Sequence, residues 1–532
     1  MVGGGLMQLV AYGAQDVYLT GNPQITFFKV IYRRHTNFAV ESIEQTFQGN
    51  ANFGRKVTAT LQRNGDLVTN VYLRVELPSG STAGLSSSPN GEWAWVSKLG
   101  HALINSVELN VGGTTIDKHY GDWFNIWYEL ARNIAKDRGY AKMIGSTPEL
   151  TTLAAAHSSA VLYIPLYFFH CRNNGLALPL IALQYHDVRY DFEFAALEDL
   201  LVTSGFSSAT PGRELGLAFN DASLYVDYVY LDQEERKKFA QASHEYLIEE
   251  IQFTGTESVS SNTNKFRLNF NHPVKEMYWV LKLGRYVNPS RQYTFLAYNP
   301  VDKDALALTA TKRFVLATAL YTAGHLDLSS NRLQAASGLT TAQAALFAAA
   351  NAAAITSAAD VDNITILGTN LSLADLSTPV ATLLAGVTRP TAGDGATVFD
   401  VVVQQYDNYG VFLDKTVNPV SQVLLQLNGH DRFSVRDGNY FNYVQPWQSH
   451  TNTPADGVNV YSFALNPEEH QPSGTCNFSR IDNATLNVTF GVDGITDFKS
   501  VFLADDSQIS IFALNYNVFR IMAGMGGKAY SN

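Results

Sequence analysis

Val107-Glu-Leu-Asn110 followed by Gly121-Asp-Trp-Phe-Asn125, and Leu425-Gln-Leu-Asn428 followed by Gly438-Asn-Tyr-Phe-Asn442, are two stretches of this chain built on one plan. In each stretch an apolar, strand-like segment is followed by a short loop. The loop leads to three successive residues, an aromatic residue, then Phe, then Asn, where we expect a helix to begin. Because the two stretches have similar spacing and lie in different halves of the chain, they suggest an internal duplication.

Strand-like segments extend this duplication along the chain. Phe38–Ile43 near the first strand matches Tyr246–Ile251. Other segments mix β-branched and aromatic residues and are bounded by Gly, Pro, Asn or Asp. The first group is 39–47, 56–62, 68–77, 103–111, 160–169, 187–194 and 223–231. The second group is 246–253, 265–271, 274–283, 423–427, 458–465, 484–490 and 509–518. Each group approaches the eight strands of a jelly roll, so the sequence predicts an all-β fold.

The composition supports a β-rich fold and disfavours a nucleic-acid coat. Of 532 residues, 46% are hydrophobic, 12% aromatic and only 16% charged, against roughly 25% charged in typical soluble proteins. Aromatic and β-branched side chains suit a pleated, half-buried surface. The net charge of −11 argues against direct nucleic-acid binding, which requires a basic face.

The chain divides into an N-terminal arm (1–37), a first jelly roll (38–235) and a second jelly roll (236–532). The boundary falls in Asp232–Ser243. It begins with Asp232–Lys238, the densest run of charge in the sequence, which we expect to form a solvated connecting helix or turn. The second half carries an insertion at about 284–400. Long excursions on a β scaffold are usually exposed. Its Ala-rich part is too polar for a membrane span.

Motifs for catalysis are missing from the sequence. It has no Walker loop, no GxSxG elbow and no HExxH or HxH pair, which disfavours an NTPase, a serine hydrolase, a zinc hydrolase and a metal-binding cupin. We therefore assign no catalytic, cofactor-binding or metal-binding residue, expect no cofactor, and predict that the chain is not an enzyme. Cys171 and Cys476 are expected to be buried free thiols of a protein assembled in a reducing compartment. Four histidines at strand ends are expected to be hydrogen-bonded loop or core residues: His119, His170, His186 and His430.

A second function class stays open from the residues alone. A carbohydrate-binding or carbohydrate-active β-sandwich protein would need only two carboxylates, and Asp407, Asp414 and Asp431 could supply them. Solvated aspartates in loop turns are the more common role of such residues.

Two long stretches resemble the major capsid proteins of nucleocytoplasmic large DNA viruses, with the algal and giant-virus branches most similar. They are Gln8–Phe38 at the N-terminus and Phe463–Ile481 near the C-terminus. The resemblance covers nearly the whole chain except the insertion. It implies two tandem eight-stranded antiparallel jelly-roll β-sandwiches, the double jelly roll. It also implies a homotrimeric pseudo-hexagonal capsomer that tiles an icosahedral shell around an internal membrane.

The resemblance also implies partners. These are further copies of the chain, minor capsid and penton proteins, and indirectly the inner viral membrane. Outer loops could contact the host surface. The chain would belong to the outer shell of the virion and be assembled in the host cytoplasm or a viral factory.

Three groups of residues have expected roles in such a shell. The arm should run along the inner face, where Arg33 and Arg34 could form ion pairs between copies or with an acidic partner. The late-motif loop should be a rigid, structural turn; its residues are Pro467, Gln471, Pro472, Ser473, Gly474, Thr475 and Arg480. Asn363 and Asn370, in the outward-facing insertion, are the candidate N-glycosylation sites, whereas we expect Asn483 and Asn487 to be mostly bare.

Overall fold

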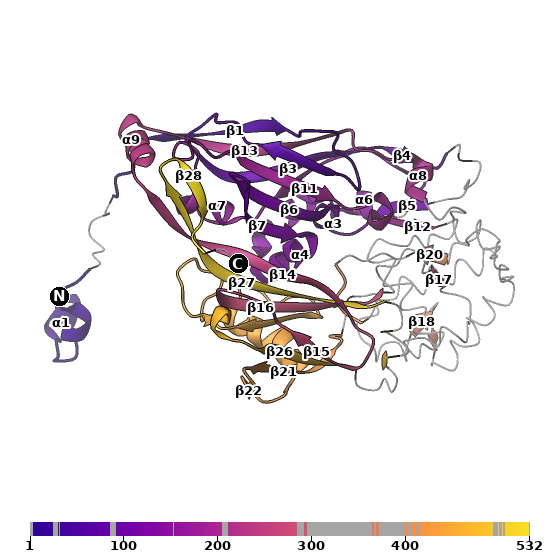
Figure 1. The fold of residues 1–532 in the computed structure, drawn as a ribbon. Helices are drawn as coiled ribbons and strands as arrows, with labels where there is room; N and C mark the ends of the chain where they lie inside the picture. The colour runs from indigo at the N-terminus through magenta and orange to yellow at the C-terminus, as the bar shows by residue number, and fades with distance from the viewer. Residues whose placement is uncertain are drawn as a thin grey trace.

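A computed structural model of the chain describes residues 4–24, 30, 32–83, 85, 92–152, 154–204, 211–284, 407–411, 415, 417–492, 498–499, 503 and 506–530, together with four short strands between residues 292 and 402. The described strands form two β-sandwiches lying side by side (Figure 1).

The first sandwich contains two antiparallel sheets that face each other. One sheet has the order β1 (Phe38–Thr46), β13 (Asp221–Leu231), β3 (Leu67–Leu77) and β9 (Ala160–Pro165), with β10 (Leu178–Pro179) also paired to β3. The other has the order β2 (Lys56–Thr60), β11 (Val188–Phe194), β6 (Ile104–Val111) and β7 (Thr114–Tyr120). Along β3, Val71, Leu73 and Val75 are buried while the residues between them are half-buried. This alternation leaves the outer face of the sheet partly open to solvent.

The second sandwich repeats this topology. One sheet has the order β14 (His244–Ser258), β27 (Gln508–Met522), β16 (Pro273–Lys282) and β24 (Val458–Ser462), with β25 (Cys476–Asn477) on β16 and β28 (Met525–Lys528) on β27. The other has the order β15 (Thr263–Arg267), β26 (Ala484–Phe490) and β21 (Val420–Leu427), which pairs with β22 (His430–Asp431) and β23 (Arg436–Asp437). The predicted double jelly roll is confirmed.

Every strand predicted from the sequence overlaps an observed one. The prediction missed β7, and it missed an additional sheet made of β17 (Gln292–Thr294), β20 (Asp400–Val402), β12 (Leu201–Ser204) and β5 (Glu92–Trp95). In that sheet Val402, from the insertion, lies opposite Thr203 of the first jelly roll. A separate hairpin pairs β18 (Ile364–Ile366) with β19 (Thr369–Leu371). The rest of residues 285–406 lies outside the described residues.

Helices fill the connections between strands. Two lie in the arm, α1 (Gly4–Val10) and α2 (Val17–Thr20), and α9 (Gln233–Gln241) connects β13 to β14. After β7 comes α4 (Gly121–Ala131); its counterpart in the second half is a π-turn, η5 (Tyr440–Val444), that continues into α16 (Gln445–Ser449).

Several short elements complete the description. They are α3 (Leu99–Leu103), α5 (Asp137–Met143), α6 (Pro148–Thr151), α7 (Phe169–Arg172), α8 (Pro211–Leu215), η1 (Ile134–Lys136), η2 (Asn174–Leu176), η3 (Leu197–Leu200), η6 (Phe478–Arg480), β4 (Gly80–Ser81) and β8 (Ala156–His157). Within the part of the chain that the structure describes, no helix meets the length and apolarity needed to span a membrane.

Candidate interaction surfaces

Helix α4 joins the two jelly rolls. It lies between them (Figure 1) and presents an apolar stripe with the i, i+3, i+4, i+7 spacing of one helix face. The stripe is Trp123, Ile126, Trp127 and Leu130, all buried. It packs on the outer face of the sheet of β14, β27, β16 and β24, against Tyr278, Val280, Phe512 and Leu514. Because this face is covered, β16 and β27 are buried on both sides.

Polar contacts surround this apolar interface. Ile251 N donates to Asp117 Oδ1 over 3.0 Å, and Lys282 Nζ lies 2.5 Å from Asp122 Oδ1 at the start of α4. At the other end of the helix, Asn452 N donates to Leu130 O over 3.0 Å. Contacts on both sides of the helix fix how the two sandwiches sit against each other.

The C-terminal hairpin of β27 and β28 provides a second connection. Tyr185 N donates to Gly524 O over 3.0 Å, and His186 Nδ1 lies 2.9 Å from Gly526 O. A Cβ atom on Gly526 would come within 2.5 Å of Leu183 Cδ2. The end of the second jelly roll therefore packs closely on the first.

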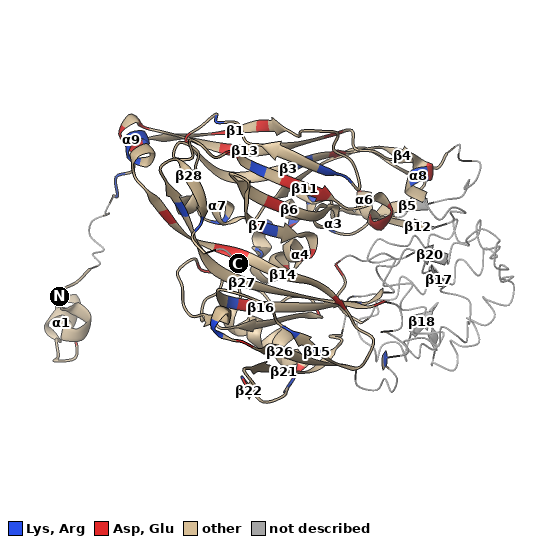
Figure 2. Ribbon diagram, in the orientation of Figure 1, with Lys and Arg blue, Asp and Glu red and all other residues tan. Residues whose placement is uncertain are grey.

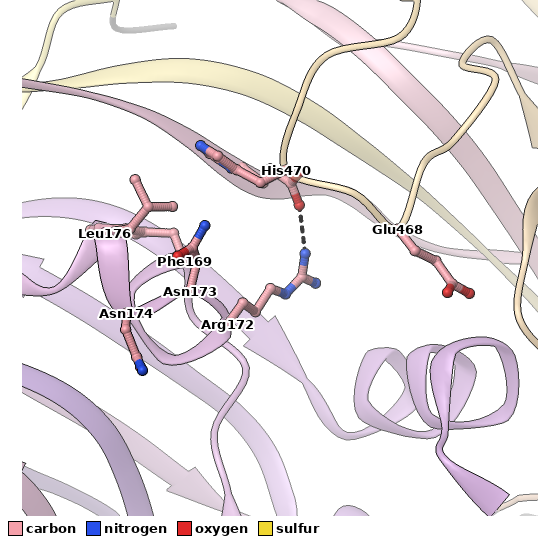
Figure 3. A pocket seen from close by; sticks show the side chains of 8 residues that line it. Phe169, Arg172, Asn173, Asn174, Leu176, Glu468 and His470 are labelled. Atoms are coloured by element: carbon pink, nitrogen blue, oxygen red, sulfur yellow. Dashed lines mark hydrogen bonds and ion pairs between the residues drawn. The ribbon is translucent and has the colours of Figure 1, made fainter. Parts of the chain in front are cut away.

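A pocket of about 370 Å³ opens between the two jelly rolls (Figure 3). It is lined by Phe169, Arg172, Asn173, Asn174 and Leu176 from the first half, and by Glu249, Glu468 and His470 from the second. Arg172 Nη1 donates to Glu249 Oε2 over 2.6 Å, and its guanidinium stacks 4.2 Å from the ring centre of Trp127. Lys275, which is only 1% exposed, also pairs with Glu249. Burial lowers the pKa of Lys275, although Glu249 opposes the shift.

The late-motif loop lies beside this pocket and is ordered by its own backbone. Asn466 N donates to Ser473 Oγ over 2.9 Å. Gly474 has φ +148°, and a Cβ there would come within 2.6 Å of Phe463 O. Pro467 is buried. The other residues of the predicted set are exposed: Gln471, Pro472, Thr475 and Arg480. The hydroxyl of Ser473 is therefore engaged in ordering the loop.

His450 attaches the same loop to the core of the second jelly roll. Its Nε2 lies 3.0 Å from Glu276 Oε1, and its Nδ1 lies 3.0 Å from Glu468 Oε1 in the loop. Burial alone would lower the pKa of His450, but the two carboxylates, Glu276 above all, raise it to about 9. The sequence alone did not identify His450 as a functional residue. The one indication was its partner Glu468, which lies within the late motif Phe463–Ile481.

The arm lies apart from both sandwiches (Figure 1). All residues of α1 and α2 are exposed, and so are Arg33 and Arg34. Large apolar side chains of the arm are exposed as well, including Leu9 at 77%, Tyr18 at 91% and Leu19 at 84%.

The candidate glycosylation sites and carboxylates are spread over the second half. Asn363 lies outside the described residues, and Asn370 falls in β19. Asn487 is half-buried and donates to Gln426 Oε1 over 3.3 Å. The three aspartates of the carbohydrate alternative are placed as follows: Asp407 pairs with Lys415, Asp431 accepts from Gln426, and Asp414 lies outside the described residues.

The histidines and cysteines occupy structural positions. His119 pairs with Asp117, His170 Nδ1 bonds the Thr69 carbonyl and His430 is exposed. Cys171 and Cys476 are free, and burial raises the pKa of Cys171 to about 12. Within the described ranges, no three His, Cys, Asp or Glu side chains gather as a metal site.

Comparison with known proteins decides the family. Residues 26–232 match the family model "Major capsid protein N-terminus", and residues 235–527 match "Large eukaryotic DNA virus major capsid protein". The chain belongs to the major capsid proteins of large eukaryotic DNA viruses. Among curated capsid proteins, it is 43% identical to capsid protein 1 of Acanthamoeba polyphaga mimivirus, covering 99% of this chain and all of the relative. It is 38% identical to the major capsid protein of Paramecium bursaria Chlorella virus 1 over the same shares.

Solved capsid structures show the same fold. The PBCV-1 VP54 crystal structure superposes with a TM-score of 0.63 and 34% identity, covering 95% of this chain and 100% of that one. The Faustovirus major capsid protein superposes with a TM-score of 0.59 at 12% identity, covering 96% and 94% of the two chains, a similarity of fold alone. This major capsid protein is a structural component of the virion shell and self-associates in it. Its relatives are not enzymes, and the carbohydrate alternative is not supported.

Proposed function

We propose that this capsid protein assembles as a homotrimer with a pseudo-hexagonal outline, the unit that tiles the icosahedral shell. The observation that carries the proposal is the repetition of one strand order in two sandwiches held side by side by α4. Three such chains around a threefold axis present six similar blocks, and a closed ring of blocks leaves no open end for uncontrolled growth.

The proposal is tested on purified full-length protein by light scattering and by electron microscopy of single particles. The expected result is a mass three times the 58.4 kDa of one chain and particles with a six-sided outline. A stable monomer at micromolar concentration would refute the trimer.

The orientation in the shell is the second part of the proposal. The arm with α1 lies at one end of the molecule, whereas β17, β18 and β20 of the insertion lie at the other end (Figure 1). Figure 2 shows α1 without a charged residue, and its exposed apolar side chains suit a protein partner beneath the shell. We assign the arm, with Arg33 and Arg34, to the inner face, towards minor capsid and penton proteins and, through them, the inner membrane. The insertion faces outward, where it can reach the host surface, and assembly takes place in the host cytoplasm or a viral factory.

A further inference from the structure

A lysine, an asparagine and a glutamate of the first jelly roll meet where that sandwich joins the second. Lys98 Nζ donates to Asn125 Oδ1 over 2.8 Å and also pairs with Glu129. Asn125 and Glu129 are four residues apart on α4, so their side chains lie on one face of the helix. The amine of Lys98 therefore contacts an amide group and a carboxylate at the same time.

The backbone of Lys98 adopts an unusual conformation at this position. Its φ of 51° and ψ of 44° lie in the left-handed region, where a residue with a Cβ atom is uncommon. Lys98 directly precedes α3, and α3 packs against α4. Strain of this kind persists only where the surrounding structure holds it, and it is concentrated at functional sites. Here the strained residue is the one that carries the amine.

The cluster is shielded from solvent, in part by residues of the second half. Asn125 is 4% exposed, and the side chains of Lys98 and Glu129 are 16% and 10% exposed. Asn125 Nδ2 donates to Tyr409 Oη over 3.3 Å, and Tyr409 is itself buried. Exclusion of water protects an amide from hydrolysis and favours its reaction with an amine that is held beside it. The site is complete only when the two halves have packed together.

A second carboxylate and a second lysine lie next to the cluster. Asp407 Oδ2 is 3.9 Å from Lys98 Nζ, and Asp407 also pairs with Lys415. Lys415 balances the charge of Asp407. Glu129 is the carboxylate in direct contact with the amine of Lys98, so it is the group placed to exchange a proton with that amine.

The duplicated position in the second half holds the same asparagine without these partners. Asn442 occupies the position of Asn125 in the repeated sequence, whereas Pro446 stands where Glu129 would be. Asn442 Nδ2 donates to two backbone carbonyls, over 2.9 Å and 3.2 Å. An asparagine at this helix entry therefore has a structural role of its own, and the lysine and the glutamate are particular to the first jelly roll.

We propose that Lys98 and Asn125 become joined by an isopeptide bond, which the protein forms on its own chain with Glu129 as base and acid. Glu129 takes a proton from the Lys98 ammonium, and the neutral amine adds to Cγ of Asn125. Glu129 then gives the proton to the amide nitrogen of Asn125, the bond between that nitrogen and Cγ breaks, and ammonia leaves. The newly linked nitrogen loses its extra proton through Glu129 to the ammonia. The products are one secondary amide and one ammonium ion, and Glu129 is again a carboxylate.

The bond has a mechanical consequence for the capsid protein. It links residues that are 27 apart in sequence, and it fixes the start of α3 to α4, the helix that joins the two jelly rolls. A cross-link restricts the unfolded chain and so stabilises the folded one. Unlike a disulfide, an amide is not broken by reductants, so it suits assembly in a reducing compartment. The reaction occurs once in each chain and is not an enzymatic turnover.

Mass spectrometry of the purified full-length protein, unfolded in denaturant, tests the bond. Wild type should be lighter than its sequence mass by one ammonia molecule. Trypsin does not cleave after an acylated lysine, so the digest should contain peptide 75–118 joined to peptide 119–132. Wild type at its full sequence mass would overturn the inference. Loss of one water molecule, with Lys98 joined to Asp407, would overturn the assignment of Asn125.

Two variants and a control distinguish the bond from a simple ion pair. Lys98→Arg keeps the positive charge without the amine, and Glu129→Gln removes the acid–base group. Both should have their full sequence mass and a lower melting temperature than wild type, because the unfolded chain is no longer restricted. Lys118→Arg is the control, since Lys118 belongs to a separate, half-exposed pair with Glu108, and it should still lose ammonia.

The variants also test the role assigned to each residue. Loss of ammonia in Glu129→Gln, with the same joined peptides as in wild type, would show that Glu129 is not the acid–base group. Loss of ammonia in Lys98→Arg would show that the mass change arises elsewhere and would overturn the inference. The wild-type digest decides the question by itself where a variant fails to fold.

Discussion

His450 is held between two carboxylates, with 3.0 Å from its Nε2 to Glu276 Oε1 and 3.0 Å from its Nδ1 to Glu468 Oε1. Its side chain and that of Glu276 are fully buried. The imidazolium therefore balances a carboxylate in the core and, at the same time, secures the late-motif loop to the sheet of the second jelly roll. A histidine so placed links the stability of the capsid protein to pH.

Stability should fall as pH rises from neutrality. The pKa of His450 is raised from 6.5 to about 9 in the folded chain, so its contribution is complete below pH 6.5 and is lost as pH rises through about 9. The shift corresponds to about 3 kcal/mol. We expect the wild-type melting temperature to drop between pH 7 and pH 9.5, and that of His450→Gln to start lower and vary less. Equal pH profiles for the two proteins would contradict the assignment.

Glu249→Gln should be strongly destabilising. Glu249 is the shared partner of Arg172 and Lys275, and its loss leaves two cations facing each other, one of them 1% exposed. Breaking a buried pair costs about 3–5 kcal/mol. The matched control on the same strand is Glu245→Gln, whose pair with Arg520 is half-exposed and should be worth less than about 1 kcal/mol. Denaturant unfolding measures both variants, and similar losses would argue against the role of Glu249.

Within the late motif, Gly474→Ala should be costlier than Ser473→Ala. The alanine Cβ would meet the Phe463 carbonyl at a backbone position with φ +148°, which favours glycine. Ser473→Ala removes one hydrogen bond to Asn466 N, worth about 1 kcal/mol. Thermal unfolding should rank the variants in this order. If Ser473→Ala instead kept the fold but abolished a hydrolase activity, the structural role would be wrong.

Removal of residues 1–25 should leave trimers unchanged. The described residues of this segment bury no side chain, so their loss should not alter the melting temperature. Shell assembly should fail, since the deleted segment carries the apolar surface assigned to partners beneath the shell. Counting particles by electron microscopy after infection with the deletion virus checks this, and normal particles would refute an inner-face role.

Proteolysis of intact particles should cut mainly within residues 300–400. The insertion is placed outward and the arm inward, so the arm should be protected until the shell is opened. Mass spectrometry of the fragments reports both segments at once. Cleavage of the arm while the insertion stays protected would show that the arm faces outward and the insertion faces inward. The same spectra should show Asn487 bare, because its amide is bonded to Gln426.

The sequence was sufficient to predict the strands but not the contacts between the two halves. Alternation and β-branched residues revealed β3, because this strand buries one face, with Val71, Leu73 and Val75 inside. Segment 114–120, which forms β7, is short and rich in polar residues, so it did not stand out from a loop. The role of Trp127 depends on which surface lies opposite α4. Spacing in sequence identifies its apolar stripe, but only the assembled fold shows that the other jelly roll covers it.

The packing of β28 on Leu183 and Tyr185 has a consequence for synthesis on the ribosome. Gly526 is translated after the whole of the first jelly roll, yet it covers part of that half. The first jelly roll must therefore wait, with that patch open, until β28 has been made. A chain that ends before β28 would keep the patch open, and we expect such products to be recognised by chaperones rather than delivered to the growing shell.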